Sequence, residues 1–427
     1  MLIDCGLFQG YKQLRLRNWA EPPFDPAAID AVVLTHAHID HSGYLPLLVR
    51  RGFRGRIVCS HATADLLKIL LPDAAHLQEE EARYANSHQF SRHHPALPLF
   101  EAADARRALR QVHPVGYARE IEVAAGMRAR LTPNGHILGS CCVNLEVDGH
   151  RVLFSGDVGR PHDALMAPPA QPGPADTLVI ESTYGNRRHP AQDPRDLLAQ
   201  IVNRTAQRGG VLIIPAFAVG RAQALLLQLH QLKESGAIGA LPVYLNSPMA
   251  GDATDLLAHH GGELRISAAE VKALCRGVRF INSPEESRRL NELSGPMIIL
   301  SASGMATGGR VLHHLKRFAP DPRNTILFAG FQAGGTRGAA LLAGEKEVKI
   351  HGDYVPVNAE VCQLENLSSH ADWAEMLDWL GGFAGAPKRT YITHGEPAAA
   401  DALRRHIEET LGWPCEVPDY LQQVPLA

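Results

Sequence analysis

Apolar and polar residues alternate along this chain with two different periods. Residues 31–35 and 57–60 are short apolar runs typical of buried strands, and residues 62–71 place apolar side chains at helical spacing. This repeated alternation of strand and helix predicts a protein of the α/β class. Residues 142–156 instead alternate apolar and polar positions around an Asp-Gly pair, which predicts a β-hairpin and a sheet that is partly antiparallel.

A different pattern begins near residue 185. From there, apolar strands are followed repeatedly by glycine-rich turns and helical segments, as in a doubly wound sheet. Histidines stand at strand ends early in the chain, and the same pattern recurs from about residue 366. If the early and late histidines serve one site, the middle segment is an insertion. We therefore expect one domain over residues 1–184 and 366–427, and an inserted domain over residues 185–365.

Length, charge and cysteine content narrow the class of protein. A chain of 427 residues fits two ordinary domains, and a net charge of −3 argues against a protein that coats nucleic acid nonspecifically. No segment approaches the roughly 18 apolar residues of a membrane span, so we expect no membrane partner. The 7 cysteines form no CxxC pair, and their odd number is typical of reduced thiols in the cytoplasm, where we expect the protein. Residues 1–5 already have the pattern of a strand, so we expect the recorded sequence to begin inside a sheet.

The densest group of potential metal ligands lies where the strand at 31–35 ends. His36, His38, Asp40 and His41 fall within six residues. Residues two apart in an extended segment point the same way, so the first two histidines can share one metal and the following turn lets the other two face a second. The alternative is a surface loop rich in histidine, but polar groups packed this densely need an ion to satisfy them.

Two further ligand candidates stand at later strand ends. His136 and Asp157 each lie beside a glycine, where a capping or turn role would explain either residue alone. Zinc takes about four donors, and two metals need a shared one. Together with the early group, these residues therefore favour a site for two metals.

These segments carry a family resemblance. Residues 36–41, 135–140 and 155–157 resemble, in order, the motifs of the metallo-β-lactamase superfamily, and residues 181–185, 369–372 and 393–396 resemble the further motifs of its β-CASP branch. The resemblance covers nearly the whole chain and is greatest to the compact prokaryotic ribonucleases of that branch. It implies a metallo-β-lactamase αββα sandwich with an inserted doubly wound α/β domain, the β-CASP domain. The family begins with a strand pair before Asp4, which this chain lacks, so we expect its first sheet to be incomplete.

The resemblance also implies a role for each residue of the site. It assigns His36, His38 and His136 to one zinc ion, Asp40, His41 and His394 to a second, and Asp157 to both, with Asp4 supporting the ligands from behind. The nucleophile would be a hydroxide between the two zinc ions. The expected catalytic residues are Asp40, His370 as the proton donor to the leaving oxygen, and Glu181, which would orient that histidine. The alternative for Glu181 is a role in capping a turn.

The inserted domain has three glycine-rich turns that each follow a strand and open a helix. Exposed N–H groups at such turns bind anions, although tight packing of helix on strand explains a single turn equally well. In the family these turns line the RNA cleft. We expect RNA phosphates to contact Arg221, Ser247, Ser301, Ser303, Gly304, Thr307, Gly308, Thr336 and Arg337. Ala339 replaces an arginine that is common in the family, so we expect a weaker grip on one phosphate.

The function that these features favour is a zinc-dependent phosphodiesterase that cuts single-stranded RNA to 5′-phosphate and 3′-hydroxyl ends. One alternative is a DNA-processing β-CASP nuclease, which His394 disfavours because such members typically have an apolar residue there. A second is a scaffold that binds RNA without cutting, which the complete set of ligand positions disfavours. A third, hydrolysis of a small thioester or lactam, does not explain the phosphate-turn domain. The sequence leaves open endonuclease or exonuclease action, replacement of zinc by manganese, and assembly as a homodimer.

Overall fold

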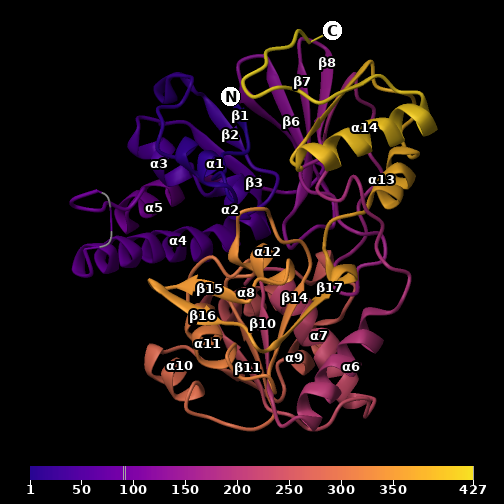
Figure 1. Ribbon diagram of the computed structural model, residues 1–427. Coiled ribbons are helices and arrows are strands. Elements are labelled where there is room, and N and C mark those ends of the chain that lie inside the picture. Colours follow the sequence, from indigo (N-terminus) through magenta and orange to yellow (C-terminus); the bar gives the residue numbers. More distant parts are fainter. Residues whose placement is uncertain (90, 92, 427) are drawn as a thin grey trace. The chain divides into compact units, whose positions relative to one another are not determined.

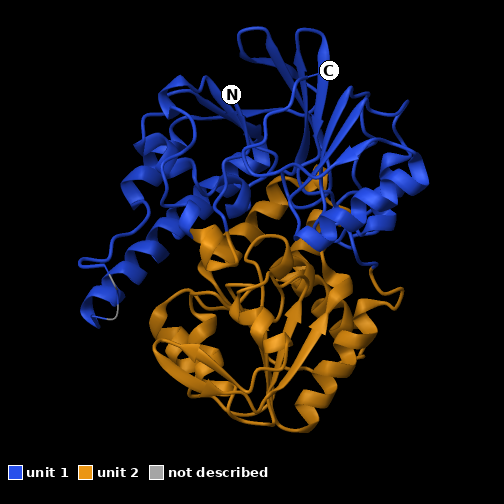
Figure 2. Cartoon of the chain, turned by 45° about the horizontal axis from the view of Figure 1, so that its top comes forward, with its two compact units in different colours: residues 1–8, 16–188, 369–427 blue, residues 9–15, 189–368 orange. Residues whose placement is uncertain are grey.

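The computed structural model describes residues 1–89, 91 and 93–426, and the chain divides into two compact units. Unit 1 comprises residues 1–8, 16–188 and 369–427, and unit 2 comprises residues 9–15 and 189–368 (Figure 2). Unit 2 therefore interrupts unit 1 in the sequence. Its bounds lie within a few residues of 185 and 365, and it also takes in a short early segment that the sequence pattern did not indicate.

A parallel sheet of four strands forms one layer of unit 1 (Figure 1). Its strands, in spatial order, are β1 (Leu2–Ile3), β2 (Ala31–Val33), β3 (Arg56–Ser60) and β4 (Val112–Val115). The helices of this part are α2 (Ile39–Ser42), α3 (Leu45–Arg50), α4 (His61–Ser87) and α5 (Ala102–Leu109), whereas α1 (Lys12–Arg17) lies mostly in the early segment that belongs to unit 2. The residues between the strands form the helices because a parallel pair needs a long crossover connection.

The second sheet of unit 1 has seven strands and mixed directions. They are β5 (Glu120–Ala124), β6 (Met127–Pro133), β7 (Cys141–Val147), β8 (His150–Phe154), β9 (Thr177–Glu181), β18 (Arg389–Thr393) and β19 (Cys415–Glu416). The order is β19-β18-β9-β8-β7-β6-β5. Strands β7 and β8 form the hairpin expected over residues 142–156, and β8, β9 and β18 run parallel to one another.

Two apolar layers hold unit 1 together. Val33 and Val58 of the first sheet share a buried cluster with Leu131 and Val143 of the second, so the sheets pack face to face. On the other face of the second sheet, a further cluster includes residues of β9, β18, α13 (Trp373–Leu380) and α14 (Pro397–Leu411). Helix, sheet, sheet and helix are the layers of the αββα sandwich that the resemblance implies.

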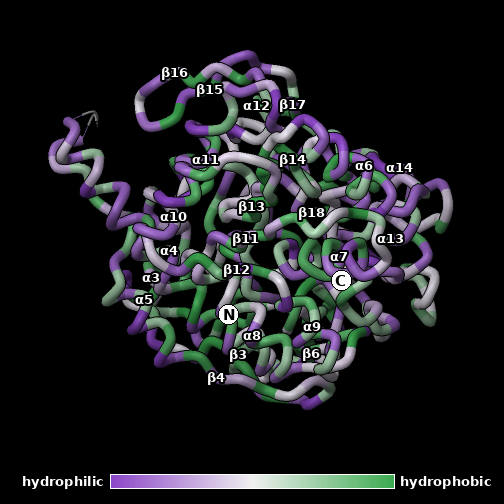
Figure 3. The backbone as a smooth tube through the Cα atoms, turned by 90° about the horizontal axis from the view of Figure 1, so that it is seen from below, coloured by the Kyte–Doolittle hydropathy of each residue, from purple (hydrophilic) through white to green (hydrophobic). Residues whose placement is uncertain are grey.

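Unit 2 is built on a parallel sheet of six strands. In spatial order they are β12 (Val278–Phe280), β11 (Val243–Asn246), β13 (Met297–Ser301), β10 (Val211–Pro215), β14 (Thr325–Ala329) and β17 (Glu360–Leu364). The colouring of Figure 3 marks the central strands as hydrophobic, which agrees with the full burial of β10, β13 and β14. Such continuous apolar strands are typical of a parallel sheet that is covered on both faces.

Helices and a small hairpin complete unit 2. The helices are α6 (Pro194–Gln207), α7 (Arg221–Glu234), α8 (Pro248–His259), α9 (Ala268–Leu274), α10 (Pro284–Leu290), α11 (Val311–Phe318) and α12 (Arg337–Leu342). Strands β15 (Glu347–Ile350) and β16 (Asp353–Pro356) pair separately from the main sheet. No helix within the described residues has an apolar stretch long enough to cross a membrane.

Candidate metal centre and active site

The early histidine-rich segment leaves the carboxyl end of β2 and turns at once into α2. Asp40 lies in the first turn of this helix and His41 in its last turn. Because the backbone is helical there and extended at His36, the side chains of Asp40 and His41 point in other directions than that of His36. Gly6 makes this turn possible, because a Cβ atom there would lie 1.5 Å from the carbonyl oxygen of Asp40. Any other residue at position 6 would push the two segments apart.

The second sheet supplies the remaining residues from one edge. His136 follows β6, Asp157 follows β8, Glu181 ends β9 and His394 follows β18. These four strands run in the same direction, so their carboxyl ends meet at one edge of the sheet. His370 joins them from the loop before α13, where Ala371 N–H donates to the carbonyl of Val158 at 2.8 Å.

One group of ligand atoms surrounds a point beside Asp157. The nitrogens of His36, His38 and His136 and an Asp157 oxygen all lie within 4.8 Å of one another. Nδ1 of His38 is 3.0 Å from Nε2 of His36 and 3.3 Å from Nε2 of His136. Oδ2 of Asp157 is 3.5 Å from Nε2 of His36 and 3.4 Å from Nε2 of His136. Three imidazoles and one carboxylate therefore converge as in a tetrahedral metal site.

A second group lies on the other side of the same aspartate. Asp40, His41 and His394 form it, with the Nε2 atoms of the two histidines 3.0 Å apart. The other oxygen of Asp157, Oδ1, lies 3.3 Å from Nε2 of His41 and 3.4 Å from Nδ1 of His394. Because its two oxygens face different groups, Asp157 has the geometry of a ligand shared by two metals.

The residues of both groups fit cations. Among the described residues, the buried Oδ1 of Asp157 has no well-aligned hydrogen-bond partner, and its neighbours are the two ring nitrogens just named. Burial is the largest effect on the pKa values of His36 and His136 and lowers both well below the ordinary value, which leaves neutral imidazoles with lone pairs to donate. Burial also opposes a charge on His394, but the carboxylates of Asp157 and Asp40 outweigh it and raise its pKa to about 9. Zinc suits neutral imidazoles with carboxylates, so a zinc ion bound by His394 would take the place of the proton that these carboxylates otherwise hold on its ring.

Asp4 supports this site through His41. Its Oδ2 lies 2.7 Å from Nδ1 of His41 and accepts from the Thr35 hydroxyl at 2.8 Å. Its Oδ1 accepts from the backbone N–H of Thr35 at 2.7 Å, which fixes the carboxylate in place. A proton held on Nδ1 of His41 leaves Nε2 of the same ring as the metal-binding atom.

His370 belongs to neither group of ligand atoms, although the centre of its ring lies 4.5 Å from that of His136, and it is paired with Glu181. Its Nδ1 lies 3.0 Å and 3.1 Å from the two carboxylate oxygens of Glu181, and its Nε2 lies 3.9 Å from Oδ2 of Asp157. Glu181 is 2% exposed and also accepts from the backbone N–H groups of Val158 and Thr183. Burial acts to lower the pKa of His370, but the charges of Glu181 and Asp157 outweigh it and the pKa lies above 6.5. The ring is thus oriented, with Nε2 directed toward the ligands.

The structure adds supporting residues that the sequence pattern did not single out. The Thr183 hydroxyl lies 3.2 Å from Nδ1 of His394. Arg160 binds Glu375 at 3.0 Å, and Glu375 also accepts from the backbone N–H of Asp372, just after His370. An acid three residues after Asp372 is a sequence signal for a helix cap, but the partner Arg160 lies 215 positions away and leaves no local signal.

The turn residues expected to contact RNA all lie in unit 2. Those that follow β10, β11, β13 and β14 share one edge of the sheet, because these strands are parallel. Ser247 caps α8, Thr336 caps α12, and the Ser303 and Thr307 hydroxyls lie 3.0 Å apart. The Ser301 hydroxyl donates to the carbonyl of Asn246 at 3.2 Å. Local contacts thus engage these hydroxyls, and their contact with RNA stays a prediction.

Arg221 and Arg337 were expected to be exposed cations that contact RNA, but the structure places both in contact with the protein itself. Arg221 is 8% exposed. Arg337 donates from Nε to the carbonyl of Lys349 at 2.9 Å and from its Nη1 to the carbonyl of Ala306. Burial lowers the pKa of Arg337. The Arg337 guanidinium therefore ties the turn after β13 to the β15–β16 hairpin, besides any role toward RNA.

Comparison with known proteins agrees with this geometry. Residues 1–204 match the family described as the metallo-beta-lactamase superfamily, residues 222–341 match the Beta-Casp domain, and residues 354–418 match the Zn-dependent metallo-hydrolase RNA specificity domain. Ribonuclease TTHA0252 of Thermus thermophilus is 36% identical over 410 residues, which are 94% of this chain and 89% of that protein. The chain belongs to the β-CASP family of the metallo-β-lactamase superfamily.

Other relatives in the β-CASP family are longer than this chain. The transcription termination factor FttA of Methanosarcina mazei is 31% identical over 430 residues, which are 96% of this chain and 65% of that protein. FttA of Methanocaldococcus jannaschii is 30% identical and also covered to 65%. The resemblance inferred from the motifs is thus confirmed, and this chain is a metal-dependent hydrolase of the β-CASP family.

Proposed function

We propose that this chain cleaves single-stranded RNA at a centre of two zinc ions and leaves 5′-phosphate and 3′-hydroxyl ends. Its membership of a family of metal-dependent RNA hydrolases makes it a ribonuclease. The observation that carries the finer proposal is Asp157, whose two oxygens face two separate groups of ligand atoms. A single-metal site would not need a buried carboxylate directed both ways.

Zinc ions held by these residues would acidify a water for attack on phosphorus and offset the negative charge that develops on the phosphate oxygens. The chain itself orients the ligands. Asp4 fixes the ring of His41, and the Thr183 hydroxyl meets the ring of His394. Ligands held from behind in this way keep their geometry when the substrate arrives.

His370 is the residue that we propose protonates the departing 3′ oxygen. Its Nδ1 is engaged by Glu181, so Nε2 is the atom that faces the ligands and carries the proton to be transferred. The carboxylate of Glu181 favours the protonated ring and raises the pKa of His370, which keeps a proton available near neutral pH.

The glycine-rich turns of unit 2 are proposed to bind RNA phosphates. Their support is the parallel sheet, which gathers the turns at one edge, where helices α8 and α12 begin. A protein with these turns and no metal ligands would fit the scaffold alternative better. The gathered ligand atoms of unit 1 favour cleavage instead.

Compartment and assembly are further parts of the proposal. All seven cysteines are free, and four of them are buried. Free thiols favour a reducing compartment, so we propose that the chain works in the cytoplasm. The proposal holds equally for a monomer and for a homodimer, because all the ligand atoms of both groups come from one chain.

The test is cleavage of one sequence supplied as 5′-labelled RNA, 3′-labelled RNA and single-stranded DNA. We expect RNA products that carry 5′-phosphate and 3′-hydroxyl ends, loss of cleavage on treatment with a chelator, and recovery on addition of zinc. Faster cleavage of DNA than of RNA would favour the DNA-processing alternative. Zinc-loaded protein that binds RNA tightly and leaves it intact would favour the scaffold.

A further inference from the structure

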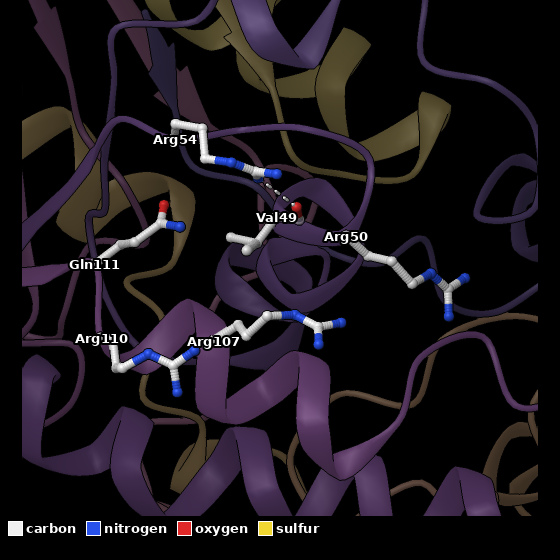
Figure 4. A pocket seen from close by; sticks show the side chains of 6 residues that line it. All are labelled: Val49, Arg50, Arg54, Arg107, Arg110 and Gln111. Atoms are coloured by element: carbon white, nitrogen blue, oxygen red, sulfur yellow. Dashed lines mark hydrogen bonds between the residues drawn. The ribbon is translucent and has the colours of Figure 1, made fainter.

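A pocket in unit 1 is lined largely by arginines (Figure 4). Its volume is about 430 Å³, within the range of sites for small molecules. The lining residues are Val49, Arg50, Arg54, Arg107, Arg110 and Gln111. In Figure 4 the side chains of Arg50 and Arg107 extend to the same side, whereas the guanidinium of Arg54 lies beside Val49 and Arg110 lies apart from the others. The chain as a whole has a net charge of −3, so this concentration of positive charge is local.

The pocket is separate from the metal centre within the same unit. Arg54 precedes β3 and Gln111 precedes β4, so both lie at the amino ends of parallel strands. The metal ligands of the first sheet follow the carboxyl end of β2, at the opposite edge. The pocket therefore lies across the sheet from the candidate active site, and the reaction proposed above does not use it.

Two of these arginines share one acidic partner, Asp104. Asp104 is 2% exposed, and its Oδ2 accepts from the backbone N–H of Glu101 at the start of α5. Arg50 lies 3.4 Å from the same carboxylate, and Arg107 pairs with its other oxygen. One buried carboxylate thus faces two cations and cannot neutralise the pocket.

The other two arginines have no acidic partner among the described residues. Arg54 donates from Nη1 to the carbonyls of Val49 and Phe53, which holds its guanidinium in place and leaves its other N–H groups available. Arg110 makes no side-chain hydrogen bond or ion pair within the part of the chain that the structure describes. Cations near the ends of α3 and α5 stabilise those helix ends, and Arg110, the C-cap residue of α5, contributes to this effect as well as lining the pocket.

We propose that this pocket binds a compact phosphate anion, namely the di- or triphosphate group of a nucleotide. Guanidinium groups match pairs of oxygens on phosphates and carboxylates, which disfavours a simple halide, and the number of arginines favours the more highly charged phosphate groups. A di- or triphosphate concentrates several negative charges in one group, which suits a pocket lined by four arginines. The phosphodiester backbone of RNA spreads one charge over each nucleotide and matches them less well. The group could belong to a free nucleotide or to the 5′ end of a triphosphorylated RNA, and the proposal does not depend on ribonuclease activity.

The test compares two double variants of the zinc-loaded chain that remove the same charge. R107A/R110A removes two of the four arginines that line the pocket. R119A/R389A removes two exposed arginines of unit 1 that make no side-chain hydrogen bond or ion pair among the described residues. By calorimetric titration with inorganic tripolyphosphate and with ATP, we expect R107A/R110A to bind at least about tenfold more weakly than wild type, and R119A/R389A to match wild type. Equal affinities of the two double variants would overturn the proposal.

A second measurement does not depend on any variant. Phenylglyoxal modifies accessible arginines, and peptide mass spectrometry reports the modification of Arg110 in the wild-type chain. We expect tripolyphosphate to protect Arg110 and to leave Arg389 modified. Protection by ATP assigns the site to free nucleotides, and protection by 5′-triphosphorylated RNA alone assigns it to an RNA end. Equal protection by 5′-hydroxyl RNA would show backbone binding and overturn the assignment to a compact phosphate.

Discussion

Nδ1 of His370 lies 3.0 Å from Oε1 of Glu181, and this carboxylate is almost completely buried. The pair leaves the other ring nitrogen of His370 facing the metal ligands. A histidine held in this way can act as an acid without binding a metal. Two of the predictions below test that distinction.

Replacing Glu181 by glutamine should shift the pH dependence of cleavage. His370 acts in its protonated form, so the rate falls as pH rises through its pKa, and the charge of Glu181 raises that pKa. In Glu181→Gln we expect the alkaline limb of the kcat profile to move to lower pH. Glu409→Gln, an exposed change of the same kind, should leave the profile in place. An unmoved limb in Glu181→Gln would assign the glutamate to structure alone.

Replacing His370 by alanine should separate chemistry from metal binding. We expect His370→Ala to retain both zinc ions and to lose on the order of 10²–10⁴-fold in rate, the usual contribution of a positioned acid. RNA with a 3′-bridging sulfur departs as a stable thiolate and should restore much of the lost rate. His394→Ala should instead lower the zinc content. If His370→Ala is purified short of zinc, the histidine is a ligand.

Replacing Asp157 by alanine should cost both metals, because its two oxygens serve both groups of ligands. Elemental analysis should then find little zinc, and the sulfur-containing RNA should not restore cleavage. Asp378→Ala, which removes an exposed carboxylate of the same unit, should keep the zinc content of the wild type. Retention of two zinc ions by Asp157→Ala would refute its role as the shared ligand.

Replacing Arg337 by alanine should weaken RNA binding and reduce the salt dependence of the affinity by about one phosphate. Turnover at saturating RNA should change much less. Because Arg337 also binds backbone carbonyls, thermal unfolding must be measured beside the affinity. The matched control is Arg323→Ala, just before β14 at the opposite edge of the sheet. A lower unfolding temperature with normal affinity and salt dependence would leave Arg337 a purely structural role.

Acid should weaken unit 2 through His314. This side chain is fully buried between Asn246 and Asn291, and burial, with the charges of His313 and Arg310, lowers its pKa from 6.5 to about 4. Below about pH 6.5 His314 is protonated in the unfolded chain but stays neutral in the folded chain. The free energy of unfolding is therefore at its full value above that pH and decreases below it. At about pH 5 the loss should be about 2 kcal/mol.

The measurement is denaturant unfolding of wild type and His314→Gln at about pH 7 and about pH 5. Other titrating groups contribute to both proteins and cancel in the difference. We expect the advantage of the wild type over the variant to shrink at the lower pH. A difference that stays constant would show that His314 does not control the acid response.

Much of the fold was visible in local pattern. The hairpin of β7 and β8 follows from alternation around Asp148-Gly149, and the run from His36 to His41 carries four ligand candidates in one turn. Family motifs then assigned the distant residues, which the structure gathers around Asp157. The local pattern can be recognised in a sequence because it depends on residue spacing, and the family motifs can be recognised because they depend on shared ancestry.

The sequence by itself determined the α/β class and the family, and it predicted an inserted domain and the candidate ligands. Only the tertiary structure decided which partners each side chain meets. In the structure the Arg337 guanidinium donates to backbone carbonyls, and Arg160 pairs with Glu375. Residues 49–54 and 107–111 line one arginine pocket. The physical reason is that these contacts join segments far apart in the chain, and periodicity records only the direction of a side chain from its own strand or helix.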